Sequence, residues 1–188
     1  SLTSKFNEEQ MNAFKEINKS VEEDEGKCFY LNGAGGCGKT TVAKALLHAA
    51  SSRGEIALAC ASSGIAATLL PKGQTAHSTF KIPIEGLYEH STCSVGGRSG
   101  RAELLRRVKF IVWDEVFMVH RYGFEAVARL MRHLRSNQEL LFGGCTILIL
   151  GDLRQTLPVL PKASRQQIID ACLTRSKVWK HFKKITLT

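Results

Sequence analysis

A glycine-rich stretch between a strand-like run and a helical run constrains this chain more than any other feature. Residues 33–40 read GAGGCGKT and match the pattern G-x-x-x-x-G-K-S/T of a phosphate-binding loop. The apolar run CFYL at 28–31 precedes the loop, and an Ala- and Leu-rich helical pattern follows over 40–53. Glycines let backbone N–H groups turn inward toward a phosphate, and the helix adds its positive dipole end. We therefore expect a strand, a phosphate-binding loop and a helix, in that order.

The polar groups of this loop have distinct expected roles toward a nucleotide. Lys39 is expected to reach the β- and γ-phosphates, and the Thr40 hydroxyl to be a ligand of Mg²⁺. The residues expected to bind the nucleotide from this loop are Gly33, Gly35, Gly36, Cys37, Gly38, Lys39, Thr40 and Thr41. A glycine-rich turn without a ligand is the alternative. Cys37 stands where a small polar residue is common, and we expect bound nucleotide to shield its thiol.

The order strand, loop, helix recurs along the chain and predicts an α/β fold. Further strands are predicted at 56–61, 108–113, 146–150 and 185–187, and helices at 8–20, 65–70, 124–135, 166–173 and 177–183. Nearly all-apolar strands that alternate with helices are typical of a mostly parallel sheet with helices on both faces. The length of 188 residues fits one domain. A Gly- and Ser-rich stretch at 85–100 lacks a clear period, and we expect it to be a mobile excursion.

Composition narrows the function classes. The longest apolar run, at 146–150, is far shorter than the ~20 residues that span a bilayer, which excludes a membrane span, and no leader supports secretion. Six cysteines without metal-ligand spacing are typical of reduced thiols in an intracellular protein. Lys and Arg number 26 against 17 Asp and Glu, and the excess lies after residue 97. This asymmetry indicates a polyanionic partner such as nucleic acid, although many basic domains bind none.

A second motif consists of an apolar strand that ends in two carboxylates, FIVWDE at 110–115. Asp114 is expected to hold the metal through its water shell, and Glu115 to orient and deprotonate the attacking water. Two such carboxylates can also cap the next helix. Ligands collect at the carboxyl ends of strands in a parallel sheet, so the sequence favours the catalytic interpretation and a hydrolase.

Several short strings extend the pattern over nearly the whole chain. They are FNEEQ at 6–10, CASSGIAATLLPKGQTAHSTFKIPI at 60–84, WDE at 113–115, GDLRQTLPV at 151–159, SRQQIIDA at 164–171 and VWK at 178–180. Together with the phosphate loop, their order resembles the PIF-type ATP-dependent DNA helicases of superfamily one, including the helicase part of Helitron transposons. The resemblance implies a RecA-like P-loop NTPase domain. It also implies ATP and Mg²⁺ as cofactors, and single-stranded DNA and DNA forks as partners.

The resemblance further implies roles for single residues. Gln10 looks like the adenine-reading glutamine of the helicase Q-motif, but it is also spaced to complete a helix capping box with Asn7. Gln155 looks like a catalytic-site residue that senses the γ-phosphate. The residues that resemble the family's single-stranded DNA path are Ser62, Ser63, Gly64, Thr75, His77 and Ser78. Their hydroxyls and backbone N–H groups suit phosphate oxygens, which position a strand without reading its sequence.

Other residues keep two interpretations. His77 can serve as a structural histidine, and Phe80 can stack on a base or fill the core, with the core favoured. The basic residues that can attract DNA or form a solvated helix face are Arg98, Arg101, Arg106, Arg107 and Lys109. The chain has Val116, Phe117 and Met118 where the family usually has Ala-Pro-Met, and Leu153 where it has Phe. We expect these changes to alter loop packing and to leave the chemistry intact.

The resemblance implies that residues 1–188 are the first of two RecA-like motor domains, in a monomeric helicase that couples ATP hydrolysis to translocation on single-stranded DNA and to unwinding. A second domain would supply a transition-state arginine worth ~10³ to 10⁵ in rate, so this chain alone is expected to hydrolyse ATP slowly and to unwind nothing. DNA repair, recombination or telomere maintenance in the nucleus or mitochondrion is the expected setting. A decayed transposon-derived DNA-binding remnant and a stand-alone P-loop NTPase remain alternatives.

Overall fold

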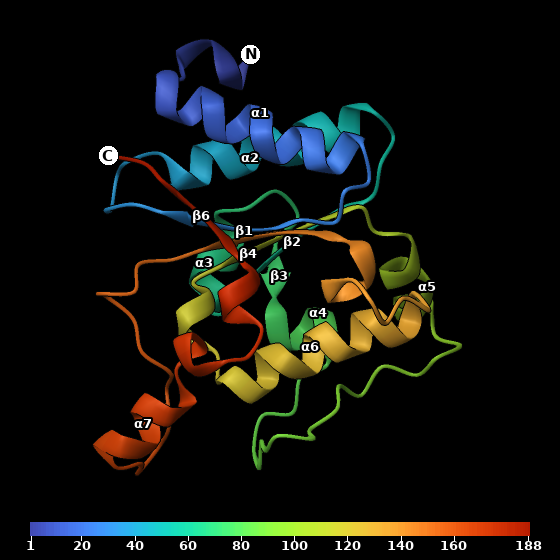
Figure 1. Ribbon diagram of the computed structural model, residues 1–188, viewed down its shortest axis with the longest axis vertical. Helices are drawn as coiled ribbons and strands as arrows, with labels where there is room; N and C mark the ends of the chain where they lie inside the picture. Colours follow the sequence, from blue (N-terminus) through green and yellow to red (C-terminus); the bar gives the residue numbers. More distant parts are fainter.

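In the computed structural model, which describes residues 1–188, six strands form one parallel sheet with helices on both faces (Figure 1). The strands are β1 (Cys28–Asn32), β2 (Ala57–Ala61), β3 (Gln74–Thr75), β4 (Phe110–Asp114), β5 (Thr146–Leu150) and β6 (Lys183–Thr186). They lie in the order β3-β2-β4-β5-β1-β6, and every pair is parallel. The helices are α1 (Glu8–Glu22), α2 (Lys39–Ser52), α3 (Gly64–Thr68), α4 (Ala76–Phe80), α5 (Gly100–Arg107), α6 (Arg121–Leu134) and α7 (Arg165–Ala171). The predicted α/β class is confirmed, and the sheet is wholly parallel.

Alternate residues of the strands fill two cores, one on each face of the sheet. In β1, Phe29 and Leu31 pack with residues of α1 and α2, whereas Tyr30 belongs to the core that includes α6. Successive side chains of a strand point to opposite faces, so a nearly all-apolar strand is buried on both sides. Figure 1 shows α1 and α2 together over one face of the sheet and α4 and α6 over the other. Burial of both faces holds the carboxyl ends of the strands in a fixed frame.

The prediction of a helix over 177–183 is wrong. Only Trp179–His181 form a short 3-10 turn, and Lys183–Thr186 are β6, which pairs with β1 and begins two residues before the predicted strand. The rings of Trp179 and Phe182 pack into the aromatic core instead of forming one face of a helix. Tertiary packing therefore overrides the local pattern here. Strand β3 escaped prediction because two residues are too few to show alternation.

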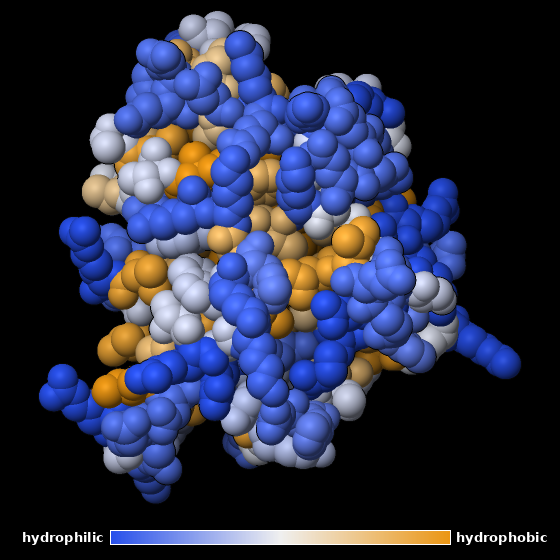
Figure 2. All heavy atoms as spheres, viewed as in Figure 1, coloured by the Kyte–Doolittle hydropathy of each residue, from blue (hydrophilic) through white to orange (hydrophobic).

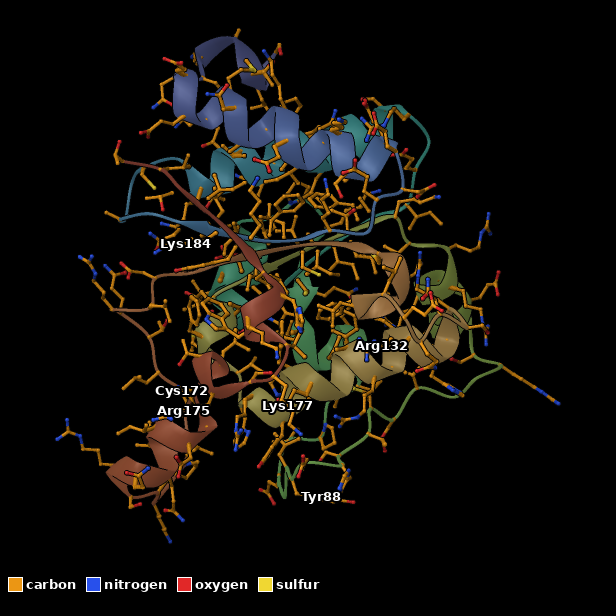
Figure 3. All side chains as sticks on the ribbon, in the orientation of Figure 1. Tyr88, Arg132, Cys172, Arg175, Lys177 and Lys184 are labelled. Carbon is orange, nitrogen blue, oxygen red and sulfur yellow. The ribbon has the colours of Figure 1, made fainter.

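The stretch that was predicted as an excursion runs from Lys81 to Ser99 without a helix or strand. Several contacts attach it to the rest of the molecule. Lys177 forms an ion pair with Glu89 at 2.8 Å, and Arg129 of α6 donates a hydrogen bond to the carbonyl oxygen of Ser91. Figure 3 shows Tyr88 on this stretch, beyond α6, and Lys177 between the two. Its mobility stays a prediction.

The six cysteines all carry free thiols. Burial raises the pKa of Cys28 and Cys145 to about 12, and it raises the pKa of Cys60 further. Such thiols are protonated and unreactive at neutral pH. Among the helices, none combines the length and the apolar character that a crossing of the lipid bilayer requires.

Candidate nucleotide-binding and catalytic site

Apart from Gln10 on α1, the predicted site residues lie at or just after the carboxyl ends of five strands and therefore lie along one edge of the sheet. The phosphate loop follows β1, Gln155 follows β5, and Asp114 and Glu115 end β4. The residues predicted for DNA follow β2 and β3. Because the sheet order is β3-β2-β4-β5-β1, the two acidic residues lie between the predicted DNA residues and the phosphate loop. In parallel α/β sheets, this edge is where ligands bind.

The phosphate loop curls around the ammonium group of Lys39. Its Nζ donates hydrogen bonds to the carbonyl oxygens of Ala34, at 2.9 Å, and of Gly33. The turn that brings the chain into α2 needs a glycine at position 38, where φ is +88° and an added Cβ would collide with Gln10. Lys39 is the first residue of α2, so the ammonium group and the positive end of a 14-residue helix meet at the loop. This arrangement can bind the phosphates of a nucleotide.

Gln10 uses both ends of its amide in the structure. Its Oε1 accepts a hydrogen bond from the backbone N–H of Asn7, while Asn7 Oδ1 accepts one from the N–H of Gln10, so the predicted capping box is confirmed. Its Nε2 donates to the carbonyl oxygen of Cys37 at 3.1 Å. Gln10 therefore connects the start of α1 to the phosphate loop. The contact with adenine stays a prediction.

The two carboxylates at the end of β4 have different surroundings. Asp114 Oδ1 accepts a hydrogen bond of 2.7 Å from the N–H of Glu115. Burial raises the pKa of Asp114, and the neighbouring Glu115 carboxylate adds to that rise, whereas this hydrogen bond and Lys39 oppose it. Glu115 has a left-handed backbone with φ +51°, and its Oε2 accepts a hydrogen bond of 2.5 Å from Ser63 Oγ. The two carboxylates therefore have different hydrogen-bond partners, the backbone N–H of Glu115 for Asp114 and the Ser63 hydroxyl for Glu115.

A divalent cation fits the oxygen donors of this edge. The carboxylate of Asp114 and the hydroxyl of Thr40 are hard ligands of the kind that Mg²⁺ prefers. No group of three or more His, Cys, Asp or Glu side chains gathers to form a protein-only metal site. Mg²⁺ usually keeps several waters and shares substrate phosphates with one or two protein ligands, so a sparse donor set is the expected one. A cation would also offset the cost of a partly buried carboxylate at Asp114.

The residues predicted for the DNA path have protein partners of several kinds. Ser62 Oγ accepts a hydrogen bond of 3.1 Å from Trp113 Nε1, and Ser63 contacts Glu115. Thr75 caps α4 by accepting a hydrogen bond from the N–H of Ser78 at 3.2 Å. His77 is half-buried and makes no side-chain hydrogen bond, and burial lowers its pKa. The hydroxyls after β2 therefore bind the end of β4 and the residue that follows it, whereas the hydroxyl at the end of β3 supports α4.

Phe80 belongs to the core. It is fully buried, and its ring stacks on Trp113 with the centroids 5.4 Å apart. The favoured interpretation is therefore confirmed, and base stacking by this residue is wrong.

The loop after β5 holds Gln155 at the surface. Its side chain makes no hydrogen bond within the chain, and the loop is shaped by Asp152, which accepts hydrogen bonds from the N–H groups of Arg154 and Gln155. Leu157 and Val159 are 59% and 71% exposed. Figure 2 shows apolar atoms at the surface on the left of the view, where Figure 1 places the segment between β5 and α7. The sensing role of Gln155 stays a prediction.

Part of the basic run lies away from the site. Helix α5 leads into β4, so its last residues and Lys109 lie at the amino end of that strand, opposite the acidic pair. Arg106 pairs with Glu103 at 3.5 Å, and Lys109 pairs with Asp24 at 2.7 Å. The structure favours a solvated, ion-paired face for these two residues over contact with a ligand at the carboxyl edge.

Tyr30 is a residue that the sequence analysis missed. Its hydroxyl donates to Asn32 Oδ1 at 2.8 Å and lies 3.4 Å from the carbonyl oxygen of Gly151. Burial raises the pKa of Tyr30 to about 12. Tyr30 therefore ties the strand before the phosphate loop to the end of β5. The signal in the sequence was a hydroxyl within the apolar run at 28–31, two residues before an asparagine.

One of the departures after the acidic pair, Phe117, packs next to Tyr30. The Phe117 ring is buried and meets the Tyr30 ring edge-on at 5.3 Å. A Cβ at Gly151 would lie 2.7 Å from that Phe117 ring, so the glycine admits the close approach. Leu153 points outward and is 38% exposed.

Comparison with known proteins shows to which family of P-loop proteins the chain belongs. The model of the family described as PIF1-like helicase matches residues 5–188. The chain belongs to the PIF1-like helicase family. It is 31% identical over 135 residues to an ATP-dependent DNA helicase Pif1 of Psychrobacter, which covers 71% of this chain and 20% of the relative.

Two solved Pif1 structures share the fold. The Bacteroides Pif1 helicase in complex with ADP-AlF3 and single-stranded DNA is 28% identical, with a TM-score of 0.77 over 94% of this chain and 41% of that one. A structure of Pif1 helicases at forked double-stranded DNA is 26% identical, with a TM-score of 0.77 over 97% of this chain and 43% of that one. The PIF1-like chain thus spans less than half of these structures, and the match confirms the RecA-like fold.

Proposed function

We propose that this chain is the ATP-binding motor domain of an ATP-dependent DNA helicase, which couples ATP hydrolysis to movement on single-stranded DNA. One observation carries the proposal. In a PIF1-like chain, the Lys39 ammonium group lies inside the phosphate loop, and the Glu115 carboxylate follows a strand of the same sheet at the same edge. This arrangement supports a phosphate-binding group and a general base that act on one ligand.

Each side chain then has a step in hydrolysis. The loop N–H groups and Lys39 would bind the phosphates, and Thr40 and Asp114 would hold Mg²⁺, which when bound would neutralise charge on the phosphates. Glu115 orients a water and accepts its proton during attack on the γ-phosphate. Gln155 would respond to the loss of that phosphate. Gln10 holds the loop from α1 and reads the adenine base.

The proposed partners are single-stranded DNA and DNA forks. One solved Pif1 helicase is in complex with single-stranded DNA, and another structure concerns DNA unwinding at forked double-stranded DNA by Pif1 helicases. The candidate path follows β2 and β3, beside the catalytic strand, and consists of Ser62, Ser63, Gly64, Thr75, His77 and Ser78. Contacts there would be to phosphate, so affinity would fall with added salt and depend little on sequence. We propose DNA repair or recombination in the nucleus or mitochondrion as the setting, and the six free thiols fit an intracellular protein.

We propose that a second RecA-like domain closes on this edge in a monomeric helicase. Large apolar side chains are exposed on the segments after β2 and β5, at Ile65, Leu69, Leu157 and Val159. Apolar surface of this kind favours a protein contact. The second domain would supply the transition-state arginine, so hydrolysis by residues 1–188 alone would be ~10³ to 10⁵ slower, and unwinding would not occur.

The proposal is tested by comparing the chain with its Lys39→Ala variant. We expect calorimetry to detect Mg-ATP binding by the parent chain and little by the variant, whereas Lys44→Ala, farther along α2, binds as the parent does. DNA-stimulated phosphate release, measured with a RecA-like partner domain joined, should disappear with Lys39→Ala. ATP hydrolysis without DNA stimulation would favour a stand-alone P-loop NTPase. DNA binding without ATP hydrolysis would favour a decayed, transposon-derived DNA-binding remnant.

A further inference from the structure

The general-base candidate Glu115 is held by a side chain from the adjacent strand. Strands β2 and β4 pair with Ala61 opposite Asp114, and the next residues of both strands leave the sheet together. Ser63 Oγ donates a hydrogen bond of 2.5 Å to Glu115 Oε2. Ser63 Oγ also accepts a hydrogen bond of 3.2 Å from the N–H of Ala66 and so caps α3. A hydroxyl has one hydrogen to donate, and here that hydrogen is committed to the carboxylate.

The hydrogen bond from Ser63 to Glu115 bears on whether Glu115 can act as a general base. A hydroxyl that donates to a carboxylate across such a short distance makes a charge-assisted hydrogen bond. The bond to Ser63 fixes where the carboxylate oxygen points, and the left-handed backbone fixes the other end of Glu115. A carboxylate held in this way is not free to turn toward a water, so Glu115 is restrained by Ser63.

Of Ser62 and Ser63, only Ser63 donates its hydroxyl hydrogen to another group of the protein. Ser62 binds Trp113, whose ring is buried against Phe80 in the core. Ser63 is half-buried beside Gly64, which is exposed, and a Cβ placed on Gly64 would meet no atom within 4 Å. The surface next to Ser63 is therefore open at Gly64. If an acceptor from solution takes the Ser63 hydroxyl hydrogen, Glu115 loses its restraint.

We propose that Ser63 is a positioning residue for Glu115 and makes ATP hydrolysis depend on single-stranded DNA. Without DNA, the Ser63 hydroxyl holds the Glu115 carboxylate and keeps hydrolysis slow. A phosphate oxygen of the DNA backbone accepts the hydroxyl hydrogen instead, and the released carboxylate turns to the attacking water. The inference rests on the proposed function and deepens it, because it assigns the coupling of the two ligands to one hydrogen bond.

The test uses three variants of this chain, and the parent and each variant carry a joined RecA-like partner domain, as in the test of the proposed function. Ser63→Gly removes the hydroxyl but keeps a residue that caps helices almost as well as serine. Ser63→Thr keeps both the hydroxyl and the cap. Thr68→Ala removes another hydroxyl of α3, which bonds only to the carbonyl oxygen of Ile65. Phosphate release from Mg-ATP is measured in single turnover, with protein in excess, with and without a thymidine oligonucleotide. Calorimetry gives ATP affinity, and fluorescence anisotropy gives oligonucleotide affinity.

We expect Ser63→Gly to hydrolyse ATP about tenfold faster than the parent chain without DNA, the size expected when a hydrogen bond to a charged group is lost. DNA should then add little, while ATP affinity stays unchanged. Ser63→Thr and Thr68→Ala should keep the low basal rate and the DNA stimulation of the parent. A purely structural serine would not change the ratio of the two rates.

Several outcomes would overturn the inference. Basal and stimulated rates that fall together in Ser63→Gly, or that stay at parental values, show that the hydroxyl does not restrain Glu115. A parent chain that binds both ligands but shows no DNA stimulation contradicts the inference and leaves ATP and DNA binding in place. A well-folded parent chain that binds neither ligand contradicts the proposed function as well.

Discussion

The side-chain amide of Gln10 donates a hydrogen bond from Nε2 to the carbonyl oxygen of Cys37 across 3.1 Å. This contact joins the first turn of α1 to the phosphate loop, 27 residues farther along the chain. The other end of the same amide completes the capping box with Asn7. The start of a helix and the shape of a ligand-binding loop thus depend on one side chain.

The substitution Gln10→Glu separates these two roles. Glutamate keeps the oxygen that the capping box needs but lacks the Nε2 donor, and it places a negative charge beside the phosphates. We expect Mg-ATP affinity to fall roughly tenfold or more, as for a lost hydrogen bond near charge, while the melting temperature changes little. Calorimetry and thermal unfolding measure the two effects. Gln166→Glu on α7 adds the same charge elsewhere and should leave affinity unchanged; equal loss in both variants would contradict the role of the contact.

The substitution Glu115→Gln should separate nucleotide binding from hydrolysis. The amide keeps an acceptor oxygen for Ser63 but cannot take a proton from water. We expect Mg-ATP binding close to that of the parent chain, with hydrolysis slower by about 10² to 10⁴. Single-turnover phosphate release measures the loss. Glu103→Gln, on α5, is the matched control, and a parental rate in Glu115→Gln would remove Glu115 from the mechanism.

The substitution Asp114→Asn should stabilise the folded chain at neutral pH. Burial raises the pKa of Asp114 above its unfolded value, so between these two values the folded state binds more protons than the unfolded state. Stability therefore falls as pH rises through that window, and at pH 7 the wild type has the full cost of the charged form. Asparagine carries no such cost. Thermal unfolding without Mg²⁺ should give a higher melting temperature for the variant at pH 7 than for the parent, with the gap closing toward pH 3. An equal gap at both values would contradict the electrostatic explanation.

Bound nucleotide should protect Cys37 from alkylation. The thiol is half-buried within the phosphate loop, 3.8 Å from Lys39 Nζ, so phosphates in the loop would cover it. Saturating Mg-ATP should slow its reaction with iodoacetamide, as followed by mass spectrometry of peptides. Cys172, also half-buried and after α7, provides an internal reference whose rate should not change. The same rate at Cys37 with and without nucleotide would count against a ligand in the loop.

Local spacing in the sequence was sufficient for the features that involve neighbouring residues. The phosphate loop, the acidic pair after β4 and the capping box of α1 each depend on groups a few residues apart, so a linear pattern contains them. The parallel sheet also followed from the sequence, because strands buried on both faces are nearly all apolar.

The tertiary structure alone decided the contacts between distant segments. Ser63 lies 52 positions from Glu115, and no local pattern specifies that β2 and β4 become neighbours with a register that joins these side chains. Trp179 and Phe182 likewise form part of an aromatic core and not of a helix, since packing against Tyr30 and Phe124 outweighs local propensity. Spacing along the chain determined which chemical groups are present, and strand order and register determined which of them meet.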